Sequence, residues 1–361
     1  MLELHTPDGA FERIEAYLGE HGFFAPGGEN LEADLYLGYG LSESLRRTRG
    51  QARPEPCPLP LAAVRVRDMS GGLSPRVRDM SRGLSPGLSP AIGQWERSWA
   101  DAEYADGIEA VRAAIARGDV YQVNLVQHLS ADFAGDPASI AKQLVAFRPR
   151  VLTGRDWAIV SASPELFLAR RGRRVSTCPI KGTRPLGEHV EGEKDSAEHV
   201  MIVDLERNDL SRVCEPASVR WPDLMVEREL AGVTHLVSTV EGTLRADVGL
   251  AELLTATFPG GSVTGAPKIA AVDLIAELEP VGRGASMGAL GVVRGNGDLE
   301  LALTIRTFAI ADGRIHLWVG GGIVWDSNPE AEIEESWTKA GPLLAAIGAP
   351  VEDVAQHWTT R

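Results

Sequence analysis

Three runs of residues with strand character follow one another near the end of the chain, and only short turns separate them. They read "ALGVVRG" (289–295), "LELALTIRTFAI" (299–310) and "RIHLWVGGGIVW" (314–325), and the helical pattern "NPEAEIEESWTKAGPLLAAIG" (328–348) follows. Parallel strands need a long crossover connection, whereas antiparallel strands can be joined by a short turn. We therefore expect antiparallel pairing and an α+β fold.

The middle of the chain alternates helical and strand-like patterns. Ile108, Val111 and Ile115 recur at helical spacing within 104–119, and an alternating run rich in β-branched residues follows over 120–133. Two further strand-like runs meet at 170–174, and the second leads directly into "PIKGTRPLG" (179–187). We predict a helix over 191–213, and another within 258–280 that a Gly-rich loop precedes, with Pro267 near its first turn.

A tandem duplication divides the chain into a short and a long part. "RVRDMSGGLSP" is followed by "RVRDMSRGLSP" and a leftover "GLSP", which together fill residues 65–90. A segment so rich in Gly, Ser, Pro and Arg buries little apolar area, so we expect a flexible loop there. This gives an abbreviated N-terminal segment over 1–64 that packs on the main body, and a catalytic body over 91–361.

Charge and composition exclude several classes of protein. The formal net charge of -14 argues against a nucleic-acid partner, because phosphates need a basic surface. The N-terminus has no secretory signal and no stretch approaches a membrane span, so we expect a cytoplasmic protein without a membrane partner. Cys57, Cys178 and Cys214 are too far apart for a CxxC metal pair or a disulfide framework, and we expect them to be buried small hydrophobes.

Acidic residues on two predicted helices form a candidate metal site. Glu332, Glu335 and Lys339 are spaced by three and four residues, which places their side chains on one helix face. By itself this pattern also fits a solvated helix face with one ion pair. Glu198, on the helix expected over 191–213, offers a further carboxylate, and we expect it to face these two across a cleft. Such hard oxygen ligands suit Mg²⁺.

Four other polar residues each leave two interpretations open. Lys181 is either a surface charge or a buried amine placed to attack a substrate. Glu165 is either a strand-edge carboxylate or an acid whose desolvation suits it to donate a proton. Arg306, on an apolar strand, either reaches solvent or grips a carboxylate. His235 is either a core histidine or a catalytic group.

The segment "GGSVTGAPK" (260–268) has the glycine spacing of a phosphate loop but lacks its lysine. Ala266 and Pro267 stand where that motif requires Lys and then Ser or Thr. A Gly-rich loop that opens a helix still offers backbone N–H groups to a carboxylate. Thr264 and Gly265 are therefore candidate substrate contacts, and a tight turn that needs glycine is the alternative.

Seven motifs in order resemble those of the chorismate-utilising enzymes, over about residues 95–345. They are "YQVNLVQ", "SASPELF", "PIKGTRP", "AEHVMIVDLERNDLSRVC", "FPGGSVTGAPK", "LTIRTF" and "GGGIVWDSNPEAEIEESWTKA". That family includes anthranilate synthase component I, isochorismate and salicylate synthases, and aminodeoxychorismate synthase component I. The Lys of "PIKGT" is similar to that of the aminodeoxychorismate enzymes, where anthranilate and isochorismate synthases usually carry Ala.

The resemblance implies a fold and a reaction. The fold is two packed antiparallel sheets with helices outside and the site in the cleft between them. The Lys181 amine adds at C2 of chorismate while the C4 hydroxyl leaves, and ammonia then adds at C4 while Lys181 leaves, giving 4-amino-4-deoxychorismate. The attacking amine has to be neutral, which desolvation or a nearby cation favours. Glu165 stands at the family's general-acid position.

Ligand contacts also follow from the resemblance. Gln122 stands where isochorismate-type enzymes place a Lys that activates water, so hydroxylation is disfavoured. Mg²⁺ and substrate would be held by carboxylates, cations and backbone amides: Glu198, Glu332 and Glu335 for the metal; Thr183, His235, Arg306, Lys339 and Gly320, Gly321 and Gly322 for the substrate.

The ammonia implies a separate glutamine amidotransferase subunit, because the chain carries no glutaminase-type set of Cys, His and Glu. The product implied is a precursor of p-aminobenzoate for folate or of a related aminoaryl metabolite. Two alternatives stay open: anthranilate synthase component I, and a catalytically weak family member that acts as a binding subunit.

Overall fold

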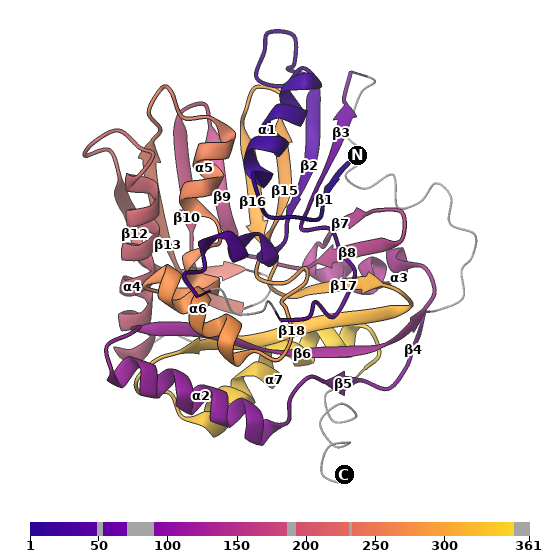
Figure 1. The fold of residues 1–361 in the computed structure, drawn as a ribbon, viewed down its shortest axis with the longest axis vertical. Helices are drawn as coiled ribbons and strands as arrows, with labels where there is room; N and C mark the ends of the chain where they lie inside the picture. Colours follow the sequence, from indigo (N-terminus) through magenta and orange to yellow (C-terminus); the bar gives the residue numbers. More distant parts are fainter. Residues whose placement is uncertain (49–52, 71–89, 186–192, 231–232, 350–361) are drawn as a thin grey trace.

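The computed structural model describes residues 1–48, 53–70, 90–185, 193–230 and 233–349. Within these ranges the strands form two antiparallel sheets, drawn in Figure 1. The strands of the larger sheet run up the view, and those of the smaller sheet run across it below. The expected α+β fold with two packed antiparallel sheets is confirmed.

The larger sheet has the strand order β1-β3-β2-β15-β16-β9-β10-β13-β11, and β12 pairs with β13. Its strands are β1 (Leu2–Leu4), β2 (Leu31–Leu37), β3 (Ala62–Asp68), β9 (Leu166–Arg171), β10 (Arg174–Cys178), β11 (Ile180–Pro185), β12 (Arg220–Leu230), β13 (Val233–Thr243), β15 (Ala289–Arg294) and β16 (Leu299–Leu303). The smaller sheet has the order β14-β6-β18-β17-β8-β7, with two short strands added to β6. Its strands are β4 (Ala91–Ile92), β5 (Glu96–Arg97), β6 (Gln122–Ala134), β7 (Arg150–Thr153), β8 (Trp157–Ser161), β14 (Gly265–Ala266), β17 (Thr307–Ala311) and β18 (Arg314–Ile323).

Helices cover the outer faces of the sheets. They are α1 (Ala10–Glu20), α2 (Asp101–Ala116), α3 (Pro137–Gln143), α4 (Glu193–Ser211), α5 (Leu250–Thr257), α6 (Lys268–Leu278) and α7 (Pro329–Ala346), with short 3₁₀ turns η1 (Tyr39–Leu45), η2 (Val145–Phe147) and η3 (Gly261–Val263). Helix α4 packs on β13, α7 packs on β18 and α2 lies beside α7. Every helix among the described residues is too short or too polar to span a lipid bilayer.

Helix α7 illustrates how the sequence sets a helix and its orientation. Asn328 caps its N-terminus by accepting from the Ala331 N–H at 3.0 Å, and Pro329 takes the first helical position, where no N–H is needed. The helix is fixed to the sheet by Gln127 of β6, whose Nε2 donates to the Ser336 Oγ at 2.6 Å. The Arg97 guanidinium lies 4.9 Å from the Trp337 ring centroid and adds a cation–π contact. These contacts orient the face of α7 that carries the predicted carboxylates.

Two sequence expectations are wrong in detail. Residues 65–68, expected at the start of a loop, lie in β3, because Arg65 pairs with Asp34 at 3.0 Å and Arg67 pairs with Asp34 and Glu32 across β2. Residues 71–89 of the expected loop fall outside the described residues.

The run over 299–310 is not one strand. It divides into β16 of the larger sheet and β17 of the smaller sheet, and residues 304–306 carry the chain from one sheet to the other. Arg306 lies at this crossing with a φ of 51°, a left-handed value that few residues other than glycine adopt. The expectation that Arg306 lies on a strand is therefore wrong. Arg306 lies at the junction between the two sheets.

A pair of buried histidines predicts how stability depends on pH. His128 of β6 and His316 of β18 are stacked, with Nε2 and Nδ1 3.0 Å apart, and burial lowers their pKa values to about 3 and about 4. Because an unfolded histidine has a pKa of about 6.5, the unfolded chain binds more protons below that pH. The stability that the neutral pair contributes is complete above about pH 6.5 and is lost as the pH falls toward the folded values.

We expect the free energy of unfolding to fall by about 2 kcal/mol per histidine between pH 7 and pH 5. Urea unfolding of the wild type and of His316→Leu at both pH values measures this effect. The variant should lose part of the pH dependence. An identical dependence in both proteins would contradict the assignment to this pair.

Candidate active site

Lys181 lies in β11, and its side chain is only 14% exposed. Its Nζ is 3.8 Å from the Glu198 Oε2 on α4. The register of β11 against β13 shifts between Lys181 and Thr183, and Gly182 between them has a φ of 60°, which glycine adopts without strain. This bulge changes the direction of the strand where Lys181 leaves it. Lys181 is thus mostly enclosed and not a solvated surface charge.

Glu165 lies between β8 and β9, and is 5% exposed. Its Oε1 accepts from the Ser262 Oγ at 2.7 Å and from the Ile180 N–H at 3.3 Å. Burial raises the pKa of this carboxyl, while Ser262, Lys181 and other neighbours oppose that effect. A carboxyl that is desolvated and hydrogen-bonded through one oxygen can keep a proton on the other and donate it.

The predicted residues of α7 gather next to Gly321 of β18. A Cβ placed on Gly321 would lie 3.4 Å from the Glu332 Oε2, 3.4 Å from the Lys339 Nζ and 3.6 Å from the Glu335 Oε1. Lys339 Nζ is 2.7 Å from the Glu335 Oε1 and donates to the Gly320 carbonyl at 3.1 Å. The structure therefore brings two carboxylates and one ammonium together over the glycine run of β18.

Carboxylate oxygens at this place are compatible with Mg²⁺, which takes a few carboxylates together with water and substrate oxygens. Within the described ranges, however, no three Asp, Glu, His or Cys side chains are grouped closely enough to hold a metal ion together. Glu198 lies beside Lys181. Glu332 and Glu335 lie by Gly321. Their joint role as metal ligands stays a prediction.

Gly322 joins the two sheets at the site. A Cβ on this residue would lie 1.9 Å from the Gln122 Nε2 and 3.5 Å from the Lys181 Nζ. Gln122 of β6, Gly322 of β18 and Lys181 of β11 therefore meet at one point. Only a residue without a Cβ leaves the Gln122 amide in its place.

Replacing Gly322 with Ala is expected to lower the turnover number by about 10²-fold, because catalytic groups displaced by about 1 Å lose that much. The 1.9 Å contact forces the buried Gln122 amide to move. The turnover number in the assay of the proposed activity given below, together with a thermal melt, measures the effect. Gly19→Ala on α1 is the control, since no atom lies within 4 Å of its added Cβ. Wild-type turnover in Gly322→Ala would contradict the close approach.

Arg306 and His235 border the same region. Burial lowers the pKa of the Arg306 guanidinium, and the charge of the Glu165 carboxyl opposes that effect. His235 of β13 is fully buried, its Nδ1 lies 3.4 Å from the Gly182 carbonyl, and burial lowers the pKa of its ring. Thr183 pairs with His235 through the backbone, and its side chain falls outside the described residues.

The Gly-rich loop approaches β6 closely. Gly265, with a φ of 140°, pairs with Val123, and a Cβ on it would lie 2.1 Å from the Gln122 carbonyl oxygen. Thr264 is fully buried, and its Oγ1 donates to the Gly260 carbonyl at 2.9 Å while its own carbonyl accepts from the Asn124 N–H at 2.7 Å. The Thr264 side chain thus stabilises the loop itself, and the loop places Ser262 against Glu165.

The sequence interpretation missed several buried polar residues of the site. Glu206 of α4 accepts from the Gly261 N–H at 2.9 Å, and burial together with Asp209 raises the pKa of its carboxyl. His199 follows Glu198 and is fully buried, and neither of its ring nitrogens has a hydrogen-bond partner in the described part of the chain. Asn124 of β6 is also buried. Its position two residues after Gln122, on the same strand face, was the available signal.

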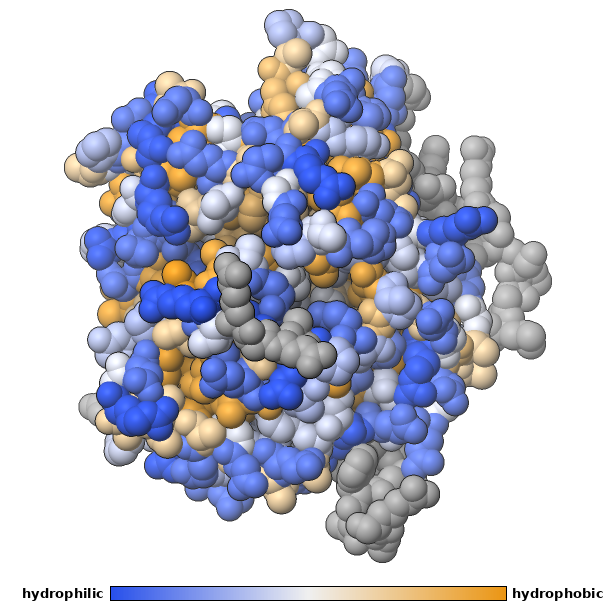
Figure 2. Space-filling model, in the orientation of Figure 1, coloured by the Kyte–Doolittle hydropathy of each residue, from blue (hydrophilic) through white to orange (hydrophobic). Residues whose placement is uncertain are grey.

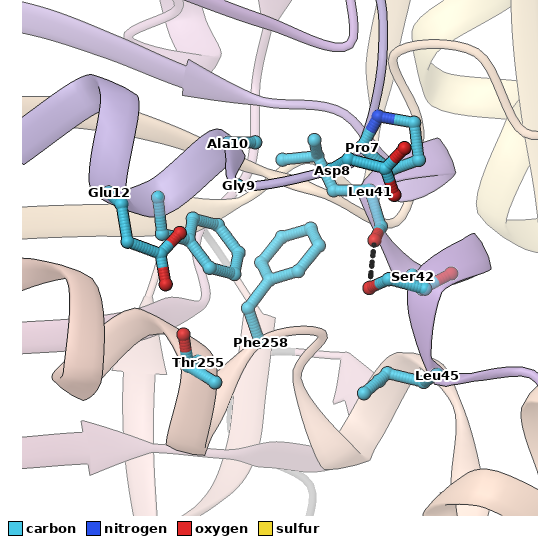
Figure 3. A pocket seen from close by; sticks show the side chains of 12 residues that line it. Pro7, Asp8, Gly9, Ala10, Glu12, Leu41, Ser42, Leu45, Thr255 and Phe258 are labelled. Atoms are coloured by element: carbon cyan, nitrogen blue, oxygen red, sulfur yellow. Dashed lines mark hydrogen bonds between the residues drawn. The ribbon is translucent and has the colours of Figure 1, made fainter.

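A separate hollow lies away from these groups, between α1, η1 and α5 (Figure 3). The labelled residues include Asp8, Glu12, Ser42 and Phe258, and the dashed line is the hydrogen bond from the Ser44 Oγ to the Leu41 carbonyl. None of the predicted catalytic residues lines it. The face in Figure 2 is largely hydrophilic with apolar patches between the charges, as expected of a solvated acidic chain.

Comparison with known proteins agrees with this geometry. Residues 78–345 match a family described as chorismate binding enzyme. Over 265 residues the chain is 40% identical to aminodeoxychorismate synthase component 1 of Klebsiella aerogenes, which covers 69% of this chain and 59% of that protein. Over 269 residues it is 39% identical to anthranilate synthase component 1 of Streptomyces coelicolor, covering 70% and 53%. The chain thus matches little more than half the length of these relatives.

A solved structure confirms the fold. The crystal structure of anthranilate synthase component I from Streptococcus pneumoniae superposes with a TM-score of 0.76 at 28% identity, covering 91% of this chain and 84% of that one. The relatives carry two different names, so likeness alone resolves the family and not its member.

Proposed function

The chain belongs to the family of chorismate binding enzymes, and from this premise we propose that it is the aminodeoxychorismate synthase type of that family. It would convert chorismate and ammonia to 4-amino-4-deoxychorismate. The observation that carries the proposal is the Lys181 amine, 14% exposed and directed toward the Glu198 carboxylate in the same site as Glu165.

The first step forms a bond between the Lys181 Nζ and C2 of chorismate. The C1=C2 double bond shifts to C6=C1, the C5=C6 double bond shifts to C4=C5, the C4–O bond breaks, and the hydroxyl leaves as water with the proton that Glu165 supplies. The adduct is a protonated secondary amine. The desolvated setting of Glu165 supports this role, since burial raises its pKa and thereby favours the protonated form.

The second step reverses the first with a different nucleophile. Ammonia bonds to C4, the two double bonds shift back to C5=C6 and C1=C2, and the C2–N electron pair returns to Lys181 as a neutral amine. Two displacements give C4 the retained configuration that one displacement does not. Glu165 ends the cycle as a carboxylate and regains its proton from solvent.

The substrate carboxylates need cationic partners. Arg306 and Lys339 would bind the enolpyruvyl carboxylate, with the backbone amides near Gly320 to Gly322. Mg²⁺, when held by Glu198, Glu335 and Glu332, would neutralise the ring carboxylate. Ammonia would come from a separate glutamine amidotransferase subunit, and the product would lead to p-aminobenzoate for folate or to a related aminoaryl metabolite.

Product analysis tests the proposal. Purified chain is incubated with chorismate, Mg²⁺ and an ammonium salt at alkaline pH, and the products are identified by mass spectrometry. The mass of aminodeoxychorismate is expected. If the product is anthranilate, the chain is an anthranilate synthase component I, which is the name of the Streptomyces coelicolor relative. Unchanged chorismate would indicate a binding subunit.

A further inference from the structure

Glu206 of α4 is a buried carboxyl that has no part in the proposed reaction steps. It is 4% exposed, and its Oε1 accepts from the Gly261 N–H at 2.9 Å. Burial and the charge of Asp209 raise the pKa of this carboxyl to about 8. Lys268 and the Gly261 N–H oppose that effect, and the charge of Glu165 adds to it. Carboxyls are almost never fully buried without a partner, and here the partner is the backbone of the turn η3.

Glu206 and Glu165 bind neighbouring residues of that turn. Gly261 donates its N–H to Glu206, and the next residue, Ser262, donates its hydroxyl to the Glu165 Oε1 at 2.7 Å. A Cβ on Gly261 would lie 3.0 Å from the Glu206 Oε1, so the backbone of the turn lies directly against this carboxyl. Adjacent residues share a rigid peptide unit, so a displacement of Gly261 moves Ser262 as well.

The other end of η3 is fixed by a different side chain. Arg283 is 2% exposed, and its Nη1 donates to the Val263 carbonyl at 2.8 Å. Its Nη2 donates to the Asn124 carbonyl of β6 at 2.7 Å. Arg283 therefore ties the end of the turn to β6, and Glu206 ties its start to α4.

The position of Ser262 affects the acid of the proposed reaction. Burial raises the pKa of Glu165, and the hydrogen bond from Ser262 is the first of the contacts that oppose this rise. Lys181, the Ile180 N–H and Arg306 act in the same direction as Ser262. A general acid is most effective when its pKa lies near the working pH, so the hydrogen bond from Ser262 controls how well Glu165 donates its proton.

We propose that Glu206 is a positioning residue, which holds the Gly261 backbone so that Ser262 keeps its hydrogen bond to Glu165. The consequence for catalysis rests on the proposed function, in which Glu165 is the acid. A direct effect of the Glu206 charge would have the opposite sign. A negative charge near a carboxyl raises the pKa of that carboxyl, so removing the charge lowers it, whereas losing the Gly261 contact raises it.

The experiment compares Glu206→Gln with Glu206→Met. Both variants lack the charge, but only Gln keeps an oxygen that can accept from the Gly261 N–H. Glu165 is titrated by NMR in protein that carries carbon-13 at the glutamate side-chain carboxyls, and its resonance is assigned by its loss in Glu165→Gln. We expect Glu165 to titrate about half a pH unit to one unit higher in Glu206→Met than in Glu206→Gln, which corresponds to the loss of one hydrogen bond.

The same pair of variants in a Ser262→Ala background tests whether Glu206 acts through Ser262. The difference between Met and Gln should vanish there, because the hydrogen bond that transmits it is already gone. Asp204→Ala is the matched control on α4, since the Asp204 side chain is 66% exposed, and it should keep the wild-type titration. The proposal is overturned if Glu165 titrates at the same pH in Met and Gln, or if their difference persists without Ser262.

A second variant perturbs the same contact from the side of the turn. A Cβ on Gly261 would lie 2.6 Å from the Leu205 Cδ2 and 3.0 Å from the Glu206 Oε1, so Gly261→Ala moves η3 away from α4. Glu165 should then titrate at higher pH than in the wild type. If a thermal melt shows that Glu206→Met does not fold, Gly261→Ala decides the question, and a wild-type titration in it contradicts the proposal.

The titration needs neither chorismate nor ammonia, so its outcome is separable from the proposed function. An anthranilate product, or no product, would refute the proposed function and leave the titration to decide the role of Glu206. In the proposed reaction, the alkaline fall in the rate of adduct formation should lie at higher pH in Glu206→Met than in Glu206→Gln. If the titration of Glu165 shifts and this fall does not, Glu165 is not the acid, and the positioning by Glu206 stands.

Discussion

Replacing Lys181 with alanine is expected to abolish formation of aminodeoxychorismate, with a loss of at least about 10³-fold in the turnover number, because the covalent route has no other nucleophile. Lys181 is enclosed, and its amine is the group nearest to Gly322 from the larger sheet. The variant should show no adduct of chorismate minus water in an intact-mass spectrum. Wild-type protein without ammonium should accumulate that adduct.

Two controls distinguish loss of the nucleophile from a general loss of activity or of the fold. Lys142→Ala removes an exposed lysine on α3 and should keep full activity. A thermal melt of Lys181→Ala tests whether the Glu198 carboxylate, left without its amine, destabilises the fold. If the folded variant retains the wild-type rate, Lys181 takes no covalent part in the reaction.

Replacing Glu165 with glutamine is expected to slow the first step by about 10² to 10⁴-fold, the usual contribution of a general acid. The amide oxygen can still accept from the Ser262 Oγ, so the geometry is kept while the donated proton is lost. Rapid-quench measurement of adduct formation without ammonium isolates this step. An unchanged rate of adduct formation would exclude Glu165 as the acid.

The pH dependence of that step gives an independent measure. Burial raises the pKa of Glu165, and the acid form is lost as the pH rises through the raised value, so the rate should fall on the alkaline side. Because the Ser262 hydrogen bond lowers this pKa, Ser262→Ala should move the alkaline fall to higher pH. The fall should be absent in Glu165→Gln. If the alkaline fall occurs at the same pH in Ser262→Ala as in the wild type, the fall reports the titration of another group.

The sequence predicted most of the elements because their patterns are local. The helical spacing of α2 and the alternation along β6 depend on near neighbours in the chain. The shared helix face of Glu332, Glu335 and Lys339 likewise follows from the helical period, and the structure places all three by Gly321. Short turns between strands predicted antiparallel sheets, which the topology confirms.

Other features depend on contacts between residues far apart in the chain, so the sequence alone did not predict them. The division of 299–310 between two sheets follows from where the chain crosses, and the pairing of Arg65 and Arg67 with β2 turned expected loop into strand. That the Gln122 Oε1 and the Asn124 Oδ1 have no donor among the described residues depends on where distant side chains lie. Hydrogen bonding and burial are sums over neighbours in space, which local sequence does not contain.

For this protein, the residue types and their spacing determined the family, the fold class and the list of polar side chains able to do chemistry. The tertiary structure alone decided which of them meet. It enclosed Lys181 beside Glu198 and buried Glu165 against Ser262. Desolvation gives each of these groups its reactivity, and it depends on how the two sheets and their helices pack around the group.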